Sequence, residues 1–114
     1  MVSFNYRLGV LGFLAHPALA DENGDYGNYG MYDQIAAIRW VRDNIAAFGG
    51  DPDRITLLGG SAGGLSAEVL NCSPLTGGLY QRAILQSSGG IELSREEADE
   101  AAREFVSLLG TEDA

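Results

Sequence analysis

One short stretch, residues 54–66, constrains the fold of this chain more than any other. It reads Arg-Ile-Thr-Leu-Leu-Gly-Gly-Ser-Ala-Gly-Gly-Leu-Ser. Residues 55–58 form a short, partly β-branched apolar run that is typical of a buried strand. The pattern G-x-S-x-G follows directly, and residues 65–70 are able to continue as a helix. The stretch therefore predicts a strand, a sharp turn with Ser61 at its apex, and a helix.

The residue types in this turn match a specific chemistry. A strained turn lifts the Ser61 hydroxyl clear of the sheet, where an ester carbonyl is able to reach it. Gly59 and Gly63 carry no Cβ, so we expect them to let the strand and the helix approach closely. The backbone N–H of Ala62 opens the helix and is expected to donate to the oxyanion that forms during attack. The motif also arises by chance, and the flanking strand and helix are what give it weight.

The composition is that of an ordinary globular domain. The chain has 114 residues, of which 46% are hydrophobic and 20% are charged, enough for one small domain. The net charge is -9, and the seven basic residues are all arginines spread singly from Arg7 to Arg103. Because no basic patch forms, we expect no nucleic-acid partner.

Cysteine and hydropathy exclude several further classes of protein. Cys72 is the single cysteine, so the sequence offers no disulfide framework and no thiolate metal cluster. We expect it to be a buried structural thiol. No apolar run approaches the length of a membrane span, and residues 1–7 lack the layout of a signal peptide. We expect a soluble chain without a membrane segment, metal or cofactor, and the compartment stays open.

Apolar segments of strand and helix periodicity alternate along the chain. In chain order they predict a strand at 2–5, a helix at 31–48, a strand at 55–58, a helix ending near 71, a strand at 83–86 and a helix at 94–109. A second apolar run at 8–14 is interrupted by glycines, and residues 15–30 read as a surface loop.

Two of the predicted helices carry specific signals. In the last one, Ser94 and Glu97 form a capping box, and Gly110 ends the helix. Its expected apolar face consists of Ala98, Ala101, Ala102, Phe105 and Leu109. The helix at 31–48 has an apolar stripe made of Ile35, Ile38, Val41, Ile45 and Phe48.

This alternation indicates an α/β fold with a parallel sheet and crossover helices on both faces. Three strands in 114 residues leave two open sheet edges, which are a liability for a free-standing domain. We therefore expect residues 1–114 to be part of a larger domain that lacks both of its flanks.

The residues resemble one family closely, the type-B carboxylesterases, which form the esterase and cholinesterase-like branch of the α/β-hydrolase fold. The resemblance covers residues 2–90, and the tail matches only in being an amphipathic helix. It rests on residues 5–9, 12–14, 28–30, 33–34, 40–45, 48–52, 59–63, 73–75 and 82–87. The resemblance implies the central part of an α/β-hydrolase domain, around its nucleophile elbow.

Carried over residue by residue, the resemblance implies that Ser61 is the nucleophile and that Ala62 supplies one oxyanion-hole N–H. The elbow itself comprises Gly59, Gly60, Gly63 and Gly64, of which the last two allow close approach of helix and strand.

Three further residues match family positions. Ser87 resembles a serine that supports the catalytic acid, and it reads equally well as a plain turn residue at a strand end. Arg7 and Asp33 match a structural ion pair, which would fix geometry and be expensive to break singly.

The departures from the family pattern are informative as well. The residue before the nucleophile is usually glutamate in this family and is Gly60 here, which removes a charge beside the serine and loosens the elbow. Ser88 stands where the family usually has glycine. Both changes bear on substrate preference and rate more than on the nucleophile itself.

The catalytic partners of Ser61 are missing from these residues. In this fold the acid and the histidine follow the nucleophile along the chain. The single histidine, His16, precedes it in a Leu-Ala-His-Pro loop and reads as a surface or supporting residue. The family's glycine-rich oxyanion loop is missing too. Because a serine without a base is a weak nucleophile, we expect negligible turnover from these residues alone.

Three hypotheses are compatible with this sequence. The first is the central part of a serine hydrolase that acts on small-molecule carboxylic esters through an acyl-enzyme at Ser61, without cofactor or metal. The second is a non-catalytic cholinesterase-like binding or adhesion module, or a remnant of an enzyme. The third is an α/β domain in which the motif is a coincidence, and the matching segments around it argue against that.

Overall fold

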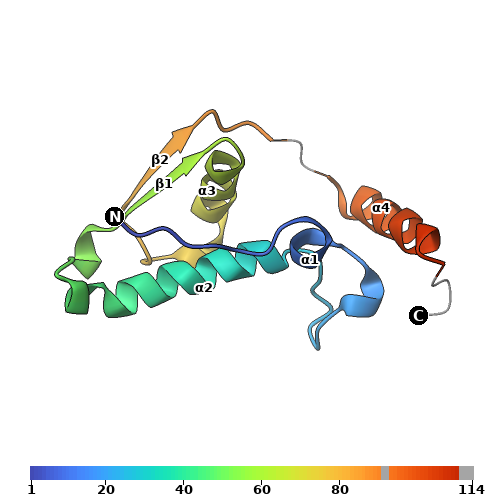
Figure 1. Cartoon of the computed structure of the whole chain (residues 1–114), viewed down its shortest axis with the longest axis horizontal. Coiled ribbons are helices and arrows are strands. Elements are labelled where there is room, and N and C mark those ends of the chain that lie inside the picture. The colour runs from blue at the N-terminus through green and yellow to red at the C-terminus, as the bar shows by residue number, and fades with distance from the viewer. Residues whose placement is uncertain (91–92, 111–114) are drawn as a thin grey trace. The chain divides into compact units, whose positions relative to one another are not determined.

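The computed structural model describes residues 1–90 and 93–110 (Figure 1). The chain divides into two compact units, of which the first contains residues 1–5 and 31–91 and the second contains residues 6–30 and 92–114. In chain order the elements are α1 (Gly9–Phe13), η1 (Pro17–Leu19), α2 (Tyr29–Asn44), η2 (Ile45–Phe48), η3 (Pro52–Arg54), β1 (Thr56–Gly60), α3 (Ala62–Cys72), η4 (Pro74–Thr76), β2 (Arg82–Gln86) and α4 (Arg95–Leu108).

The sheet of the first unit consists of β1 and β2, which run parallel and are joined by the crossover helix α3 (Figure 1). The register pairs Thr56 with Arg82 at one end and Gly60 with Gln86 at the other. Thus both strands deliver their carboxyl ends to the same edge, where the G-x-S-x-G turn leaves β1. The predicted β–α–β order around the motif is confirmed.

The core of the first unit lies between the helices and one face of this sheet. Its buried members are Ile35 and Ile38 from α2, Leu70 from α3, and Leu79, and Met31, Leu57 and Tyr80 pack against them. Leu57 and Gly59 alternate to the same face of β1. On the other face Leu58 is 58% exposed and Ile84 is 48% exposed. In the described residues, α2 and α3 therefore share one face of the sheet.

The predicted strand at residues 2–5 is wrong, because residues 1–8 form neither helix nor strand. An apolar, extended sequence becomes a strand only when a neighbouring strand accepts and donates its backbone hydrogen bonds. Among the described residues, β1 and β2 pair with each other. The following apolar run, which contains Gly9 and Gly12, forms the short helix α1.

The helix predicted at 31–48 begins two residues earlier as α2 and ends at Asn44, after which the chain tightens into the 3₁₀ turn η2. Ile35 and Ile38 are buried as expected, whereas Phe48 is 72% exposed. The 3₁₀ turn has 3.0 residues per turn instead of 3.6, which rotates its residues out of the α-helical stripe. Phe48 instead lies against Trp40, with 6.1 Å between ring centroids.

Cys72 is exposed, which contradicts the predicted buried thiol. It is the last residue of α3, whose buried positions are Gly64, Ala67 and Leu70. These positions recur every three residues on one side of the helix, and Cys72 lies two residues past the last of them, away from that stripe.

The last helix, α4, belongs to the second unit and confirms the predicted capping box. The Ser94 hydroxyl oxygen accepts from the Glu97 N–H at 3.2 Å, and the Glu97 carboxylate accepts from the Ser94 N–H at 2.7 Å. Of the expected apolar face, Ala102 is buried and Leu109 is 60% exposed.

A loop in the same unit is tied to α4 by polar contacts. The Tyr26 hydroxyl donates to the Asp99 carboxylate at 2.9 Å, and Arg95 Nε donates to the Tyr26 oxygen at 3.0 Å. The Arg95 guanidinium also lies over the Tyr26 ring, 4.5 Å from its centroid. These contacts raise the pKa of Arg95, with the hydrogen bond to Tyr26 as the largest cause.

Removing the cap is expected to loosen the first turn of α4. Ser94→Ala deletes an N-cap side chain, which costs about 1 kcal/mol of local stability. The hydrogen bonds from the Ser94 backbone and then its side chain lower the pKa of Glu97. Amide hydrogen exchange at the start of α4 should therefore speed up in Ser94→Ala at neutral pH.

The same cap should depend on pH in a defined direction. Because the pKa of Glu97 is lower in the folded helix than in the unfolded chain, its stabilisation is present above the unfolded pKa and is lost as the pH falls through the folded pKa. The exchange difference between the natural protein and Glu97→Gln should shrink on acidification. A difference that grows in acid would contradict the capping role of the carboxylate.

Candidate active site

Ser61 is held in a strained backbone conformation at the turn between β1 and α3. Its φ is 53° and its ψ is -119°, a region that side-chain-bearing residues rarely adopt and that costs about 1–3 kcal/mol. Two hydrogen bonds hold it there. The Ser61 N–H donates to the Gln86 carbonyl at 2.9 Å, and its own carbonyl accepts from the Leu65 N–H at 3.0 Å. The side chain is exposed at the carboxyl edge of the sheet.

Gly59 makes this turn sterically allowed. A Cβ placed on Gly59 would overlap the carbonyl of Gly63 and would come within 2.8 Å of the Gly64 nitrogen. Both are backbone atoms of α3, which are unable to move aside without displacing the helix. The strand and the helix therefore cross at a distance that only glycine permits at this position.

Gly64 plays the equivalent part against the end of β2. A Cβ there would lie 2.8 Å from the Gln86 carbonyl oxygen and 3.2 Å from the Ser88 Cβ. The close approach expected at this glycine is therefore present in the structure. The serine at position 88, which departs from the family pattern, is one of the atoms against which Gly64 packs.

Gly60 and Gly63 are under no such constraint. A Cβ on either residue would meet no described atom within 4 Å. The expectation that Gly63 must lack a Cβ for strand and helix to close is therefore wrong. At Gly63 the backbone carbonyl, not the space above the Cα, forms the close contact with Gly59. Gly60 has room for a side chain beside Ser61 among the described residues.

Ala62 is the first residue of α3 and is exposed. The first N–H groups of a helix have no carbonyl partner one turn earlier, and the helix dipole makes this end positive. Leu65 is the residue whose N–H reaches back to Ser61. The N–H groups that precede it, beginning with Ala62, therefore belong to the unpaired first turn beside the serine.

Ser87 is a second strained serine at the same edge of the sheet. Its φ is 51°, and it shares a positive φ with Ser61 and with no other non-glycine residue in the described part of the chain. It directly follows Gln86, which pairs with Gly60 in the sheet. The two serines thus leave the paired ends of neighbouring strands. The support of a catalytic acid by Ser87 stays a prediction.

Three other predicted residues lie elsewhere. Arg7 is in the second unit and Asp33 in the first, and their ion pair stays a prediction. The Arg7 guanidinium carbon lies 5.6 Å from the centroid of the Tyr29 ring. His16 Nδ1 accepts from the Ala18 N–H at 3.2 Å and so caps the turn η1. That bond gives the histidine a structural part in its own loop.

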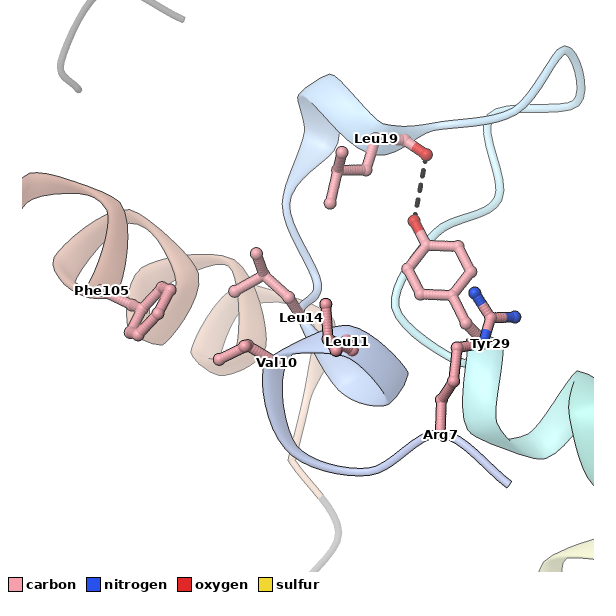
Figure 2. Close-up of a pocket in the computed structure, with 7 residues that line it drawn as sticks. All are labelled: Arg7, Val10, Leu11, Leu14, Leu19, Tyr29 and Phe105. Atoms are coloured by element: carbon pink, nitrogen blue, oxygen red, sulfur yellow. Dashed lines mark hydrogen bonds between the residues drawn. The ribbon is translucent and has the colours of Figure 1, made fainter. Parts of the chain in front are cut away.

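The second unit contains an open pocket of about 410 Å³ (Figure 2). Its walls are largely aliphatic and aromatic, and the Tyr29 hydroxyl donates to the Leu19 carbonyl at 3.0 Å on one side. The lining residues are Arg7, Val10, Leu11, Leu14, Leu19, Tyr29 and Phe105. Because they include no serine, cysteine, histidine or carboxylate, we assign no catalytic group to this pocket.

Within residues 1–90 and 93–110, His, Cys, Asp and Glu side chains form no group of three that could hold a metal ion. The helices of these residues are also too short or too polar to cross a membrane.

Sequence comparison places the chain among esterases. A profile of the carboxylesterase family matches residues 1–113. The para-nitrobenzyl esterase of Bacillus subtilis is 44% identical over 110 residues, which cover 96% of this chain and 22% of that protein. The fumonisin B1 esterase of Sphingopyxis macrogoltabida is 55% identical over 91 residues, covering 78% and 17%. The chain thus spans about a fifth of the length of these relatives.

Solved structures agree with this assignment. A thermophilic para-nitrobenzyl esterase superposes with a TM-score of 0.84 at 43% identity, over 93% of this chain and 22% of the other. A carboxylesterase of Geobacillus stearothermophilus gives 0.85 at 45% identity, over 93% and 23%. The expected α/β-hydrolase fold is confirmed.

The contrast between Gly59 and Gly63 gives a matched pair of variants. Gly59→Ala forces a Cβ into the backbone of α3 and should destabilise the protein by about 2–3 kcal/mol or prevent folding. Gly63→Ala fills open space in a helix and should be neutral or stabilise by about 0.5 kcal/mol. Denaturant unfolding of the whole protein measures both, and equal losses would refute the crossing at Gly59.

Proposed function

Because the chain belongs to the carboxylesterase family, we propose that the whole protein hydrolyses small-molecule carboxylic esters through an acyl-enzyme at Ser61. The observation that carries this proposal is the exposed serine held at φ 53° between a strand and a helix N-terminus. We propose further that residues 1–114 are the central part of one α/β-hydrolase domain, which agrees with their spanning about a fifth of the relatives' length.

In the proposed reaction the Ser61 oxygen attacks the ester carbonyl carbon and forms a new C–O bond, while the carbonyl π electrons move to the oxygen. Collapse of this intermediate breaks the bond to the alcohol, which leaves with a proton. Water then repeats the attack on the acyl-enzyme, releases the acid and returns the proton to Ser61. The serine proton needs a general base, which in this fold is a histidine later in the chain than the nucleophile.

Ala62 is the proposed donor to the negative oxygen of the intermediate. Its N–H begins α3 directly beside the attacking serine, at the positive end of the helix dipole. A donor that is already in place needs no reorganisation when charge develops, and removal of one such donor typically slows the reaction by about 10²–10³-fold.

Ser87 and Gly60 are proposed to tune this site. Ser87 leaves the neighbouring strand at the same edge as Ser61 and is placed to support the acid that orients the base. Gly60 presents neither charge nor bulk beside the nucleophile, and a side chain there would meet no described atom. We propose that this difference from the family's usual glutamate alters which esters the enzyme prefers.

Covalent labelling tests the nucleophile. A fluorophosphonate probe phosphonylates an activated serine, so the whole protein should gain one probe mass on the peptide that contains Ser61. Ser61→Ala should abolish the label, while Ser107→Ala, at an exposed serine whose hydroxyl donates to the Glu104 carbonyl in α4, should keep it. Labelling that survives Ser61→Ala would refute the assignment, and a whole protein that takes no label would favour the non-catalytic alternative.

The strain at Ser61 has a separate thermodynamic signature. Ser61→Ala keeps the positive φ and removes only the hydroxyl, whereas Ser61→Gly relieves a strain of about 1–3 kcal/mol against an unfolded-state entropy loss of about 0.5–1 kcal/mol. The glycine variant should therefore be about 1 kcal/mol more stable than the alanine variant in denaturant unfolding. Equal stabilities would show that the turn stores no strain.

A further inference from the structure

A buried glutamine joins the two helices behind the turn. Gln34 on α2 is 3% exposed, and its Nε2 donates to the Ser66 hydroxyl oxygen on α3 at 3.1 Å. The next residue on α2, Ile35, belongs to the apolar core. Burying an amide has a desolvation cost that an aliphatic side chain would avoid. Packing alone therefore gives no account of a glutamine here.

The part of α3 next to the turn has little else to fix its rotation. Its first three residues are Ala62, Gly63 and Gly64, which offer almost no side chain for a neighbouring helix to grip. The crossing at Gly59 sets how close the helix comes to β1, but smooth glycine contacts leave rotation about the helix axis less restricted. Apolar burial further along, at Leu70, is non-directional, whereas a hydrogen bond has a preferred angle.

Ser66 is well placed to control that rotation. It lies four residues after Ala62, so the two share one face of α3 on successive turns. Backbone atoms lie on a radius of about 2.3 Å, so a rotation of about 20° displaces them by about 0.8 Å. A displacement of about 1 Å at a catalytic group is enough to slow a reaction by about 10²-fold.

We propose that Gln34 is a positioning residue for the esterase reaction, acting through Ser66 to hold α3 at the rotation that aims the Ala62 N–H at the oxyanion. This inference rests on the proposed function, since the oxyanion exists only if Ser61 is acylated. Gln34 acts at a distance, because it touches Ser66 and neither the nucleophile nor the donor.

The test compares three variants in the whole protein with a chromogenic para-nitrophenyl ester. Gln34→Met keeps the length of the side chain and removes the donor, and Ser66→Ala removes the acceptor. Each should lower kcat by about 10- to 100-fold with KM changed less than about twofold, because the oxyanion is stabilised only in the transition state. The double variant should lose no more than either single variant, since both act through one bond.

Two controls separate positioning from loss of stability. Ser66→Thr keeps the hydroxyl and should retain most of the natural kcat. Ile38→Val removes one buried methyl from the same helix without touching the bond and should leave kcat unchanged. If Gln34→Met lowers stability while kcat stays natural, or if the two single losses multiply in the double variant, the inference is overturned.

The fluorophosphonate probe distinguishes this failure from a failure of the proposed function. If the natural protein takes no label, the esterase proposal fails and the positioning role fails with it. If the natural protein is labelled and Gln34→Met is labelled at the same rate, only the positioning role is overturned. A label that forms about 10-fold or more slowly in Gln34→Met supports it.

Discussion

The contact between Gly59 and the backbone of Gly63 is the constraint on which the rest of the site depends. It brings α3 so close to β1 that the chain has a single residue, Ser61, in which to reverse direction. That single residue then takes a positive φ, and its N–H is captured by the Gln86 carbonyl of the neighbouring strand. Any side chain at Gly59 would push the helix outward and let the turn relax.

The strain at Ser61 is tolerated because the surrounding unit over-determines it. The parallel pairing of β1 and β2, the Gly64 contact on β2 and the Leu70 cluster each hold one end of α3. A conformation that costs about 1–3 kcal/mol persists when such contacts supply more than that, and strained residues of this kind concentrate at functional sites. The exposed hydroxyl is the chemical gain from this arrangement.

Polar contacts in the interior have a different part from the apolar ones. Ile35, Ile38, Leu70 and Leu79 hold the helices against the sheet without specifying a rotation. The bond from Gln34 to Ser66 adds direction, since it ties one face of α3 to one residue of α2. Similar logic applies at the glycines, where Gly59 and Gly64 set distances while Gly60 and Gly63 leave room.

The sequence by itself determined the features that depend on neighbouring residues. The β1–turn–α3 order, the parallel β2 and the capping box at Ser94 all follow from local patterns, because hydrophobic periodicity and cap chemistry act over a few residues. Family likeness then identified the α/β-hydrolase fold.

Only the tertiary structure decided the features that need atoms distant in the sequence. Residues 2–5 form no strand because a strand needs a partner, and Phe48 and Cys72 are exposed because burial depends on which face meets the core. The unequal constraints on the four glycines, the positive φ of Ser87 and the bond from Gln34 to Ser66 likewise depend on where β2, α2 and α3 pack. Local sequence patterns carry no record of those distances.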